Sequence, residues 1–284
     1  MENEAAKGLE GAERTLLLPL WARAKEINRS HPQMRDPLAV EIVNALCGKP
    51  EYKEIFADLE KGLDNFYQLS QVIRAQCLDE EIRMYLQAHP QATVVNIGAG
   101  LDTTFSRIDN GRLSRWYDLD LPEVIALRQK FIPEKERCTC IPKSVLDTTW
   151  FDDIGDTKNG LMCVACGVLF FLSEAHIKSL LVSMAGRFPG SEIAFDTMSA
   201  LFMNIGNRTV LRKGGMGGQA RMQWPIQSAG TLKKWSNRIS VVDEYPMYSR
   251  CLFDPSWGRA AISRMKLINR LHGMNIFHLA FREE

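Results

Sequence analysis

The chain has 284 residues, of which 45% are hydrophobic and 24% are charged, and its formal net charge is +1. A chain of this length can bury most of its apolar surface in one large domain or two smaller ones. The balance of 35 basic against 34 acidic residues excludes the broad positive field that binds nucleic acids or anionic membranes.

The first apolar run, residues 16–21, is too short to span a bilayer and lacks the basic start of a signal peptide. The seven cysteines are scattered and odd in number, which does not predict a secreted disulfide framework. Cys163 and Cys166 have the spacing of a metal or redox pair. However, they lie in an apolar run that predicts a strand, where residues three apart point to opposite faces. We therefore expect a cytoplasmic protein without a metal site.

The first ninety residues predict helices rather than strands. Segments 37–47 and 65–89 place apolar residues at helical spacing, and each begins beside an Asp or Asn that can cap it. Pro90 ends the second helix, because the residue before a proline avoids the helical region. We interpret residues 1–90 as an N-terminal helical cap and residues 91–284 as the main domain, the two forming one structural unit.

From Thr93 onward, short apolar strands alternate with helices. Five strands are predicted at 93–97, 115–117, 138–141, 161–166 and 192–195, helices at 122–131 and 173–187, and two closing strands at 239–243 and 275–281. This alternation predicts an α/β fold with a mostly parallel, seven-stranded sheet that has helices on both faces. Residues 201–235 break the rhythm, and we interpret them as a flexible insertion between the fifth and sixth strands.

A glycine pair ends the first predicted strand, in Asn96-Ile97-Gly98-Ala99-Gly100. Glycines at this position let the backbone approach a ligand closely and open a helix whose amino end faces it. Asp118 and Asp120 end the second predicted strand, where a carboxylate can accept hydrogen bonds from ribose hydroxyls. Singly, these features are more typical of an ordinary tight turn and a solvated strand end. In register, they predict a nucleoside site.

The dinucleotide-binding motif has a third glycine where this chain has Thr103. That glycine supports close packing of helix and strand beside a pyrophosphate. Its absence favours a nucleoside ligand without a pyrophosphate, such as S-adenosylmethionine, over NAD.

Two motifs closely resemble the leucine carboxyl methyltransferase family, in particular its polyketide-methylating branch. They are NIGAGLDT at 96–103 and WYDLDLPEV at 116–124. Weaker similarities extend the resemblance over most of the chain, at 11–17, 21–24, 36–37 and 144–147. The resemblance implies a Rossmann-like class I methyltransferase fold that binds S-adenosylmethionine.

The resemblance also implies a set of cofactor-contacting positions, which here are Arg23, Arg74, Gly98, Ala99, Gly100, Asp118, Asp120, Leu121, Ser144 and Val145. Asp120 would hold the ribose, with Asp118 as second candidate, and Ser144 and Val145 would border the adenine. Arg74 would hold the methionine carboxylate, assisted by Arg23 or Lys25, because an Arg–carboxylate fork is directional. A surface arginine on an amphipathic helix is the alternative interpretation of Arg74.

One position departs from the family. After the fourth strand the family carries Glu followed by a small residue, and here that place holds Cys166 and Gly167. The change removes a hydrogen-bonding partner beside the cofactor. A non-catalytic S-adenosylmethionine-binding or regulatory protein therefore stays an alternative, as does an NAD-linked oxidoreductase, which Thr103 disfavours.

The resemblance implies methyl transfer to an oxygen of a small acidic molecule. Such an in-line displacement mainly requires alignment and exclusion of water. A carboxylate is already ionised near neutral pH, whereas a phenol, with a pKa of about 10, would gain from a base. His176, His272 and His278 cannot be placed at an acceptor, so no catalytic residue is predicted. Carboxyl and hydroxyl acceptors both stay open.

We expect the acceptor between the helical cap and residues 201–235. Trp224, Trp257, Tyr245 and Tyr248 are candidate walls, although such aromatics are as often plain core.

Four glycines within 214–218, together with Arg208, Arg212, Lys213 and Arg221, predict a mobile lid that recruits an anionic acceptor. A solvated loop without a role is the alternative. The expected partner is a small acidic molecule rather than a nucleic acid or a membrane, and homo-oligomerisation stays open.

Overall fold

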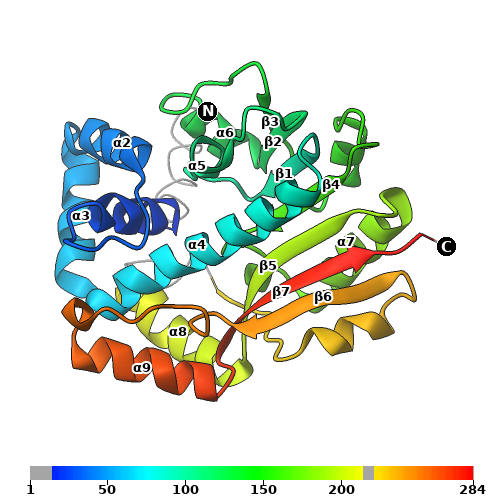
Figure 1. Cartoon of the computed structure of the whole chain (residues 1–284). Coiled ribbons are helices and arrows are strands. Elements are labelled where there is room, and N and C mark those ends of the chain that lie inside the picture. The colour runs from blue at the N-terminus through cyan, green and yellow to red at the C-terminus, as the bar shows by residue number, and fades with distance from the viewer. Residues whose placement is uncertain (1–14, 214–220, 284) are drawn as a thin grey trace.

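The computed structural model describes residues 15–213 and 221–283, which include a seven-stranded sheet in the order β3-β2-β1-β4-β5-β7-β6 (Figure 1). The pairings among β1 to β5 are parallel, whereas β7 lies antiparallel between β5 and β6. The expected seven-stranded α/β sheet is confirmed, and it is mixed. The strands are β1 (Thr93–Ile97), β2 (Arg115–Asp120), β3 (Cys138–Pro142), β4 (Leu161–Ala165), β5 (Glu192–Met198), β6 (Ile239–Pro246) and β7 (Met274–Phe281).

A helical stretch at 15–26 is followed by eight α-helices in the described residues. They are α2 (Pro37–Cys47), α3 (Pro50–Gly62), α4 (Asn65–Ala88), α5 (Thr104–Ile108), α6 (Pro122–Arg128), α7 (Glu174–Arg187), α8 (Ala200–Lys213) and α9 (Arg259–Arg270). Short 3₁₀ turns lie at η1 (Thr148–Asp152), η2 (Leu169–Phe171), η3 (Ala229–Lys234) and η4 (Pro255–Trp257). The caps predicted for α2 and α4 are present, because Asp36 and Asp64 each accept a backbone N–H from the first turn of their helix, and Ser173 caps α7 in the same way.

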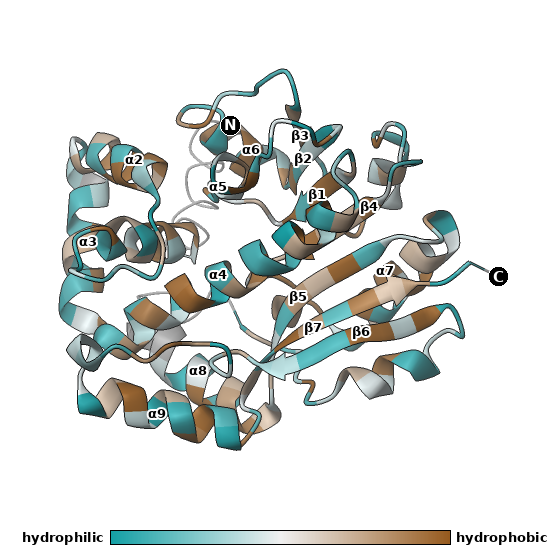
Figure 2. Ribbon diagram, viewed as in Figure 1, coloured by the Kyte–Doolittle hydropathy of each residue, from teal (hydrophilic) through white to brown (hydrophobic). Residues whose placement is uncertain are grey.

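Two hydrophobic cores lie on the two faces of the sheet. Figure 2 shows hydrophobic residues along the strands and along the helices that cover them. Alternation along each strand assigns its residues to the two sides, so Val94 joins one core and Val95 the other. Cys163 lies in the second core, whereas Cys166 packs against the first, as their spacing on a strand predicts. All seven cysteines are free thiols.

Helix α4 crosses one face of the sheet diagonally (Figure 1), and its side chains are buried on several sides. A helix covered in this way is normally apolar all round. Instead, α4 buries five polar or charged side chains, those of Gln68, Ser70, Arg74, Asp79 and Glu81. Buried groups of this kind need partners inside the protein. Two of them, Ser70 and Arg74, line the cavity described below.

Residues 201–235 differ from the expected flexible insertion. They begin as helix α8, and the chain that returns from it is fastened by Asn207, whose side chain exchanges two 3.0 Å hydrogen bonds with the backbone of Met222. The glycines at 214–218 lie outside the described residues, and so do the side chains of Arg212 and Lys213. The predicted lid therefore stays a prediction for that part of the segment.

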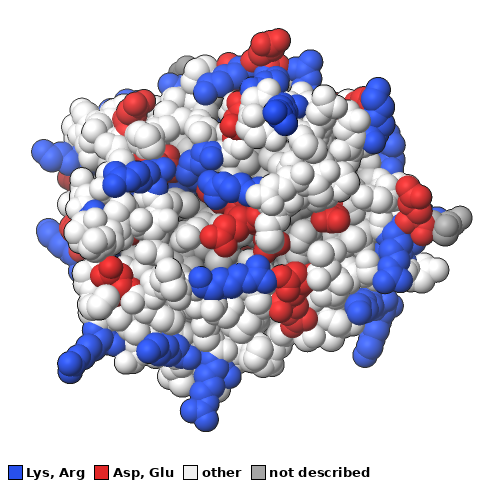
Figure 3. Space-filling view, viewed as in Figure 1, with Lys and Arg blue, Asp and Glu red and all other residues white. Residues whose placement is uncertain are grey.

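On the face shown in Figure 3, acidic and basic side chains are interspersed over the surface. None of the helices in the described ranges is long and apolar enough to cross a membrane.

Candidate functional site

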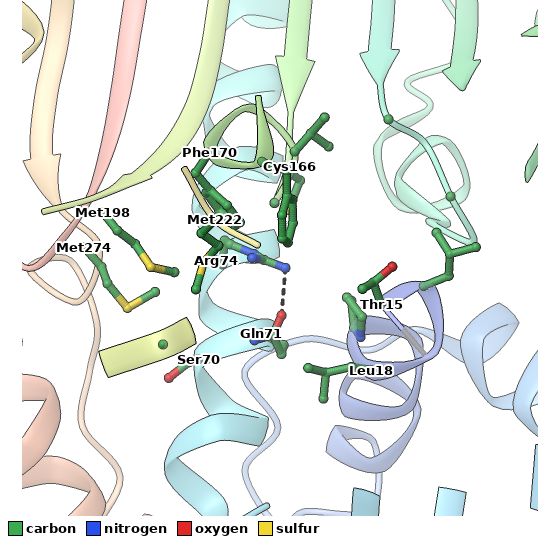
Figure 4. A pocket seen from close by; sticks show the side chains of 18 of the residues that line it. Thr15, Leu18, Ser70, Gln71, Arg74, Cys166, Phe170, Met198, Met222 and Met274 are labelled. Atoms are coloured by element: carbon green, nitrogen blue, oxygen red, sulfur yellow. Dashed lines mark hydrogen bonds between the residues drawn. The ribbon is translucent and has the colours of Figure 1, made fainter. Parts of the chain in front are cut away.

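A cavity of about 590 Å³ opens at the carboxyl ends of β1, β2, β4 and β5, between the sheet, α4, α8 and α9 (Figure 4). Its walls come from the turn after β1, the segment after β4, and side chains of these helices. The carboxyl edge of an open α/β sheet is where ligands usually bind, and cavities of about 300–1,000 Å³ take small molecules. The cavity is therefore the candidate site.

The turn after β1 forms one end of this cavity. Gly98 and Gly100 adopt φ angles of +67° and +47°, which side-chain-bearing residues rarely adopt. Space is a second requirement, because a Cβ at Gly98 would lie 2.3 Å from Val168 Cγ2, and one at Gly100 would lie 2.8 Å from Leu16 Cδ2. Both glycines and Ala99 line the cavity, as expected from the sequence.

Asp120 lines the cavity beside this turn. Its Oδ2 accepts the N–H of Gly100 at 2.8 Å, and its Oδ1 accepts the N–H of Leu121 at 2.7 Å. Burial raises the pKa of Asp120, although these two amide hydrogen bonds lower it. A carboxylate has about four acceptor positions, so two stay available for a ligand's hydroxyl groups.

Asp118 has different surroundings, although it lies only two residues earlier on β2. It is 1% exposed, forms an ion pair with Arg128 at 2.6 Å, and accepts hydrogen bonds from Asn96 and from the Trp116 indole. Its oxygens are thus occupied inside the protein. The structure does not bring Asp118 to the cavity, in contrast to its place as second ribose candidate.

Arginines hold the glycine turn from its other side. Arg128 Nη1 donates to the carbonyls of Gly100 at 3.0 Å and Asp102 at 2.6 Å, and Arg23 Nη2 donates to that of Leu101 at 3.3 Å. Arg23 lines the cavity, but it also pairs with Asp36 at 2.9 Å, so it is committed to the protein. Sequence reasoning missed Arg128, whose only sequence signal is its place at the end of the mostly apolar helix α6.

Arg107 connects the same turn to the helical cap. Its guanidinium forms a two-atom contact with Asp79 at 2.8 and 3.0 Å and pairs with Asp36 at 2.9 Å. Asp102, on the turn itself, lies 3.5 Å away. Sequence reasoning also missed Arg107, because these carboxylates come from segments far apart in the chain.

Arg74 projects from α4 into the middle of the cavity (Figure 4). It is 7% exposed, which excludes the surface-arginine interpretation. Its Nη2 donates to Gln71 Oε1 at 2.7 Å, and its Nη1 lies 3.5 Å from Oδ2 of Asp196. The Nε of Arg74 has no hydrogen-bond partner among the described residues. A buried donor without a partner is costly, so this atom indicates a place for a ligand's acceptor.

Cys166, which stands where the resemblance to the family implies a glutamate, lines the cavity next to Arg74. Burial raises the pKa of its thiol to about 12, although the nearby Arg74 lowers it. The thiol is therefore neutral at physiological pH and supplies no negative charge. The carboxylate that faces Arg74 comes instead from Asp196 on β5, which also accepts the N–H of Gly167 at 2.6 Å.

Two predicted adenine contacts lie away from the cavity lining. Ser144 and Val145 are half-buried, and the Ser144 hydroxyl accepts the N–H of Leu146 at 3.2 Å. Leu121 does line the cavity. Lys25 pairs with Glu60 at the surface and does not reach the cavity.

The aromatic residues predicted as acceptor walls are core residues instead. Trp224 lies in the core on the opposite side of the sheet, and Trp257 is buried under α9. Tyr245 donates to Glu81 at 2.6 Å, and Tyr248 shares a 2.8 Å hydrogen bond with Ser70. The end of the cavity away from the glycine turn is lined instead by other apolar side chains, namely Phe66, Phe170, Phe171, Met198, Phe202, Met222, Ile268 and Met274.

The three histidines of the C-terminal half do not line the cavity. His278 is buried between two carboxylates, with Nδ1 at 2.8 Å from Glu81 and Nε2 at 2.7 Å from Glu192. Burial lowers the pKa of His278, but these two hydrogen bonds together raise it to about 9. His278 is therefore held by Glu81 and Glu192 and lies away from the cavity lining.

Comparison with known proteins gives a family match. The sequence model of the leucine carboxyl methyltransferase family matches residues 17–185. The chain is 30% identical over 190 residues, 67% of each chain, to the tetracenomycin polyketide synthesis O-methyltransferase TcmP of Streptomyces glaucescens. It is 27% identical over 240 residues to the S-adenosyl-L-methionine-dependent methyltransferase dpfgK of Gibberella zeae, covering 80% of this chain and 76% of that protein.

The fold is similar to that of solved structures. A DUF574 family protein of Streptomyces avermitilis superposes with a TM-score of 0.59 at 13% identity, covering 85% of this chain and 96% of that one.

Proposed function

The chain belongs to the leucine carboxyl methyltransferase family, and on this basis we propose that it is an S-adenosylmethionine-dependent O-methyltransferase of small, acidic, polyketide-like molecules. The observation that carries the proposal is one continuous cavity, in which Asp120 and the glycine turn lie at one end, Arg74 in the middle and an apolar compartment at the other end. The cofactor supplies an electrophilic methyl group on a sulfonium. The protein has to hold, align and shield the two reactants.

The residues at the first end suit this cofactor. The two available acceptor positions of Asp120 match ribose hydroxyls, and the turn at Gly98–Gly100 lets a ligand approach the backbone. Arg74 matches the carboxylate of the methionine portion, because its unpartnered Nε points to a missing acceptor. Gln71 and Asp196 hold the guanidinium on both sides, so it is oriented before the carboxylate binds.

The lining of the cavity favours a carboxylate over a phenol as the acceptor. No histidine occurs among the described residues that line it, and the Cys166 thiol is neutral because burial raises its pKa to about 12. A carboxylate is ionised without help, whereas a phenol requires a base. The apolar walls would hold the acid beside the methyl group and exclude water, which would otherwise compete for that group.

The test is methyl transfer from S-adenosylmethionine carrying a ¹³C-labelled methyl group to a panel of aromatic acids and phenols, followed by mass spectrometry. We expect labelled methyl esters from acids and little labelled ether from phenols. Binding of S-adenosylhomocysteine together with no transfer to any acid would contradict the proposal. That result would favour the non-catalytic alternative raised by Cys166.

A further inference from the structure

The far end of the cavity is built from flexible apolar side chains of separate elements. Met198 comes from the end of β5, Met222 from the chain that returns after α8, and Met274 from the start of β7. Figure 4 shows Met198 and Met274 on one side of Arg74, with Thr15 and Leu18 of the N-terminal helical stretch on the other side. Thioethers are polarizable, adapt to irregular shapes and pack well against aromatic rings.

Three of the polar side chains that line the cavity, those of Ser70, Thr209 and Arg264, already have partners in the protein. The Ser70 hydroxyl bonds to the carbonyl of Phe66 at 2.6 Å and to Tyr248 at 2.8 Å, and Thr209 donates to the carbonyl of Ile205 at 2.7 Å. Arg264, at the α9 side, pairs with Asp64 at 2.7 Å. A polar group on the buried body of a ligand would lose its water here without gaining these partners.

Gly206 on α8 determines how far the wall extends into this compartment. A Cβ at this position would lie 2.7 Å from Cε of Met222 and 4.0 Å from Sδ of Met198. Only the tip of a flexible side chain would have to move, so alanine at 206 is compatible with the fold. The displaced Met222 methyl group would occupy space that is now open.

We propose that this methionine-lined compartment is the acceptor site, that it takes acids whose body is an apolar ring system without polar substituents, and that Gly206 sets the size of the ring system. The proposal rests on the proposed function for the position of the acid group, which would face the cofactor's methyl group. It goes beyond that function in specifying the body of the acceptor and the residue that limits it.

The test is calorimetric binding of benzoic acid, 2-naphthoic acid and 6-hydroxy-2-naphthoic acid, with and without S-adenosylhomocysteine. We expect 2-naphthoic acid to bind most tightly, and its hydroxylated form about tenfold more weakly because the hydroxyl is buried without a partner. Gly206→Ala should weaken the binding of 2-naphthoic acid by about tenfold or more, which is the scale of one methyl group in an apolar pocket. The affinity for benzoic acid should stay within about twofold of the wild-type value.

Gly186→Ala is the matched control, because Gly186 is exposed on helix α7 and a Cβ there meets no neighbouring atom within 4 Å. It should leave all three affinities unchanged. Gly206→Ala combined with Met222→Ala should restore 2-naphthoic acid binding, because the clashing methyl group is gone. Both glycine variants should fold, since alanine is the better helix former.

Three results would overturn the proposal. The first is tighter binding of the hydroxylated acid than of 2-naphthoic acid. The others are, in Gly206→Ala, an equal loss of affinity for benzoic and 2-naphthoic acid, or no loss of affinity for either. A wild-type protein that does not bind S-adenosylhomocysteine would instead contradict the proposed function. In that case, size-selective naphthoate binding would still support the apolar compartment, because this measurement does not require methyl transfer.

Discussion

The Nη2 atom of Arg128 lies 2.6 Å from Oδ2 of Asp118, and both side chains are 1% exposed. The same guanidinium donates to the carbonyls of Gly100 and Asp102, so this buried pair joins β2 and α6 to the glycine turn. The carbonyls of the turn are therefore held in place from inside the protein. A turn fixed in this way loses little conformational freedom when a ligand binds.

Asp118→Ala should destabilise the fold. Removing one partner of a buried ion pair leaves the other charge uncompensated, at a cost of about 3–5 kcal/mol. We expect the free energy of unfolding, measured by urea denaturation, to fall by this amount. A loss below about 1 kcal/mol would show that Arg128 finds another partner or water, and would contradict a structural role for Asp118.

Asp120→Ala should act on the cofactor instead. The ribose hydroxyls would lose a charged acceptor, so the affinity for S-adenosylhomocysteine should fall by about 1–3 kcal/mol in calorimetry. The free energy of unfolding should change less than in Asp118→Ala, because Asp120 is partly open to the cavity. If Asp120→Ala binds the ligand as tightly as wild type, the assignment of Asp120 to the ribose is wrong.

Arg74→Lys should weaken S-adenosylhomocysteine binding although it keeps the positive charge. A lysine cannot form the directional fork, so charge-assisted hydrogen bonds worth about 1.5–3 kcal/mol would be lost in part. Arg83→Lys is the matched control, because Arg83 lies on the same helix with 47% of its side chain exposed. Equal affinities of Arg74→Lys and wild type would count against the carboxylate contact.

Stability should depend on pH through His278. Its pKa rises from 6.5 to about 9 in the folded protein, since hydrogen bonds to Glu192 and Glu81 outweigh the effect of burial. A raised pKa stabilises the fold fully below about pH 6.5, and this contribution is lost as the pH rises through about 9. Protonated His278 thus contributes about 3 kcal/mol at most to the free energy of unfolding.

The measurement is the free energy of unfolding between about pH 7 and pH 10, for wild type and His278→Gln. Wild type should lose stability over this interval more steeply than the variant, which lacks the titrating imidazole. Parallel pH profiles for the two proteins would show that His278 is not protonated between its two carboxylates.

Local patterns predicted much of the fold. Helix α2 and strand β1 have the predicted bounds, because apolar spacing, a capping aspartate and flanking glycines all lie within a few residues of them. Helix α8 was missed because polar residues and Gly206 interrupt its apolar pattern. Helix α9 was also missed, although the sequence carries a signal for it, since Ala261, Met265 and Ile268 are apolar residues at helical spacing and are buried.

Some residues of the site could be predicted from the sequence and others could not. Gly98, Gly100 and Asp120 could be found because they belong to two short motifs at strand ends. Arg107 could not, because its contact with Asp36 joins residues 71 positions apart. Trp224, a candidate acceptor wall, lies in the core on the opposite side of the sheet. The sequence could not exclude it, because it does not show which face of the sheet a late segment covers.

The most direct test of the account is calorimetric titration of the wild-type protein with S-adenosylhomocysteine and, separately, with NAD. The glycine turn followed by Thr103, together with Asp120 and the free Nε of Arg74, predicts saturable binding of S-adenosylhomocysteine and no binding of NAD. Micromolar affinity for NAD without detectable binding of S-adenosylhomocysteine would contradict it.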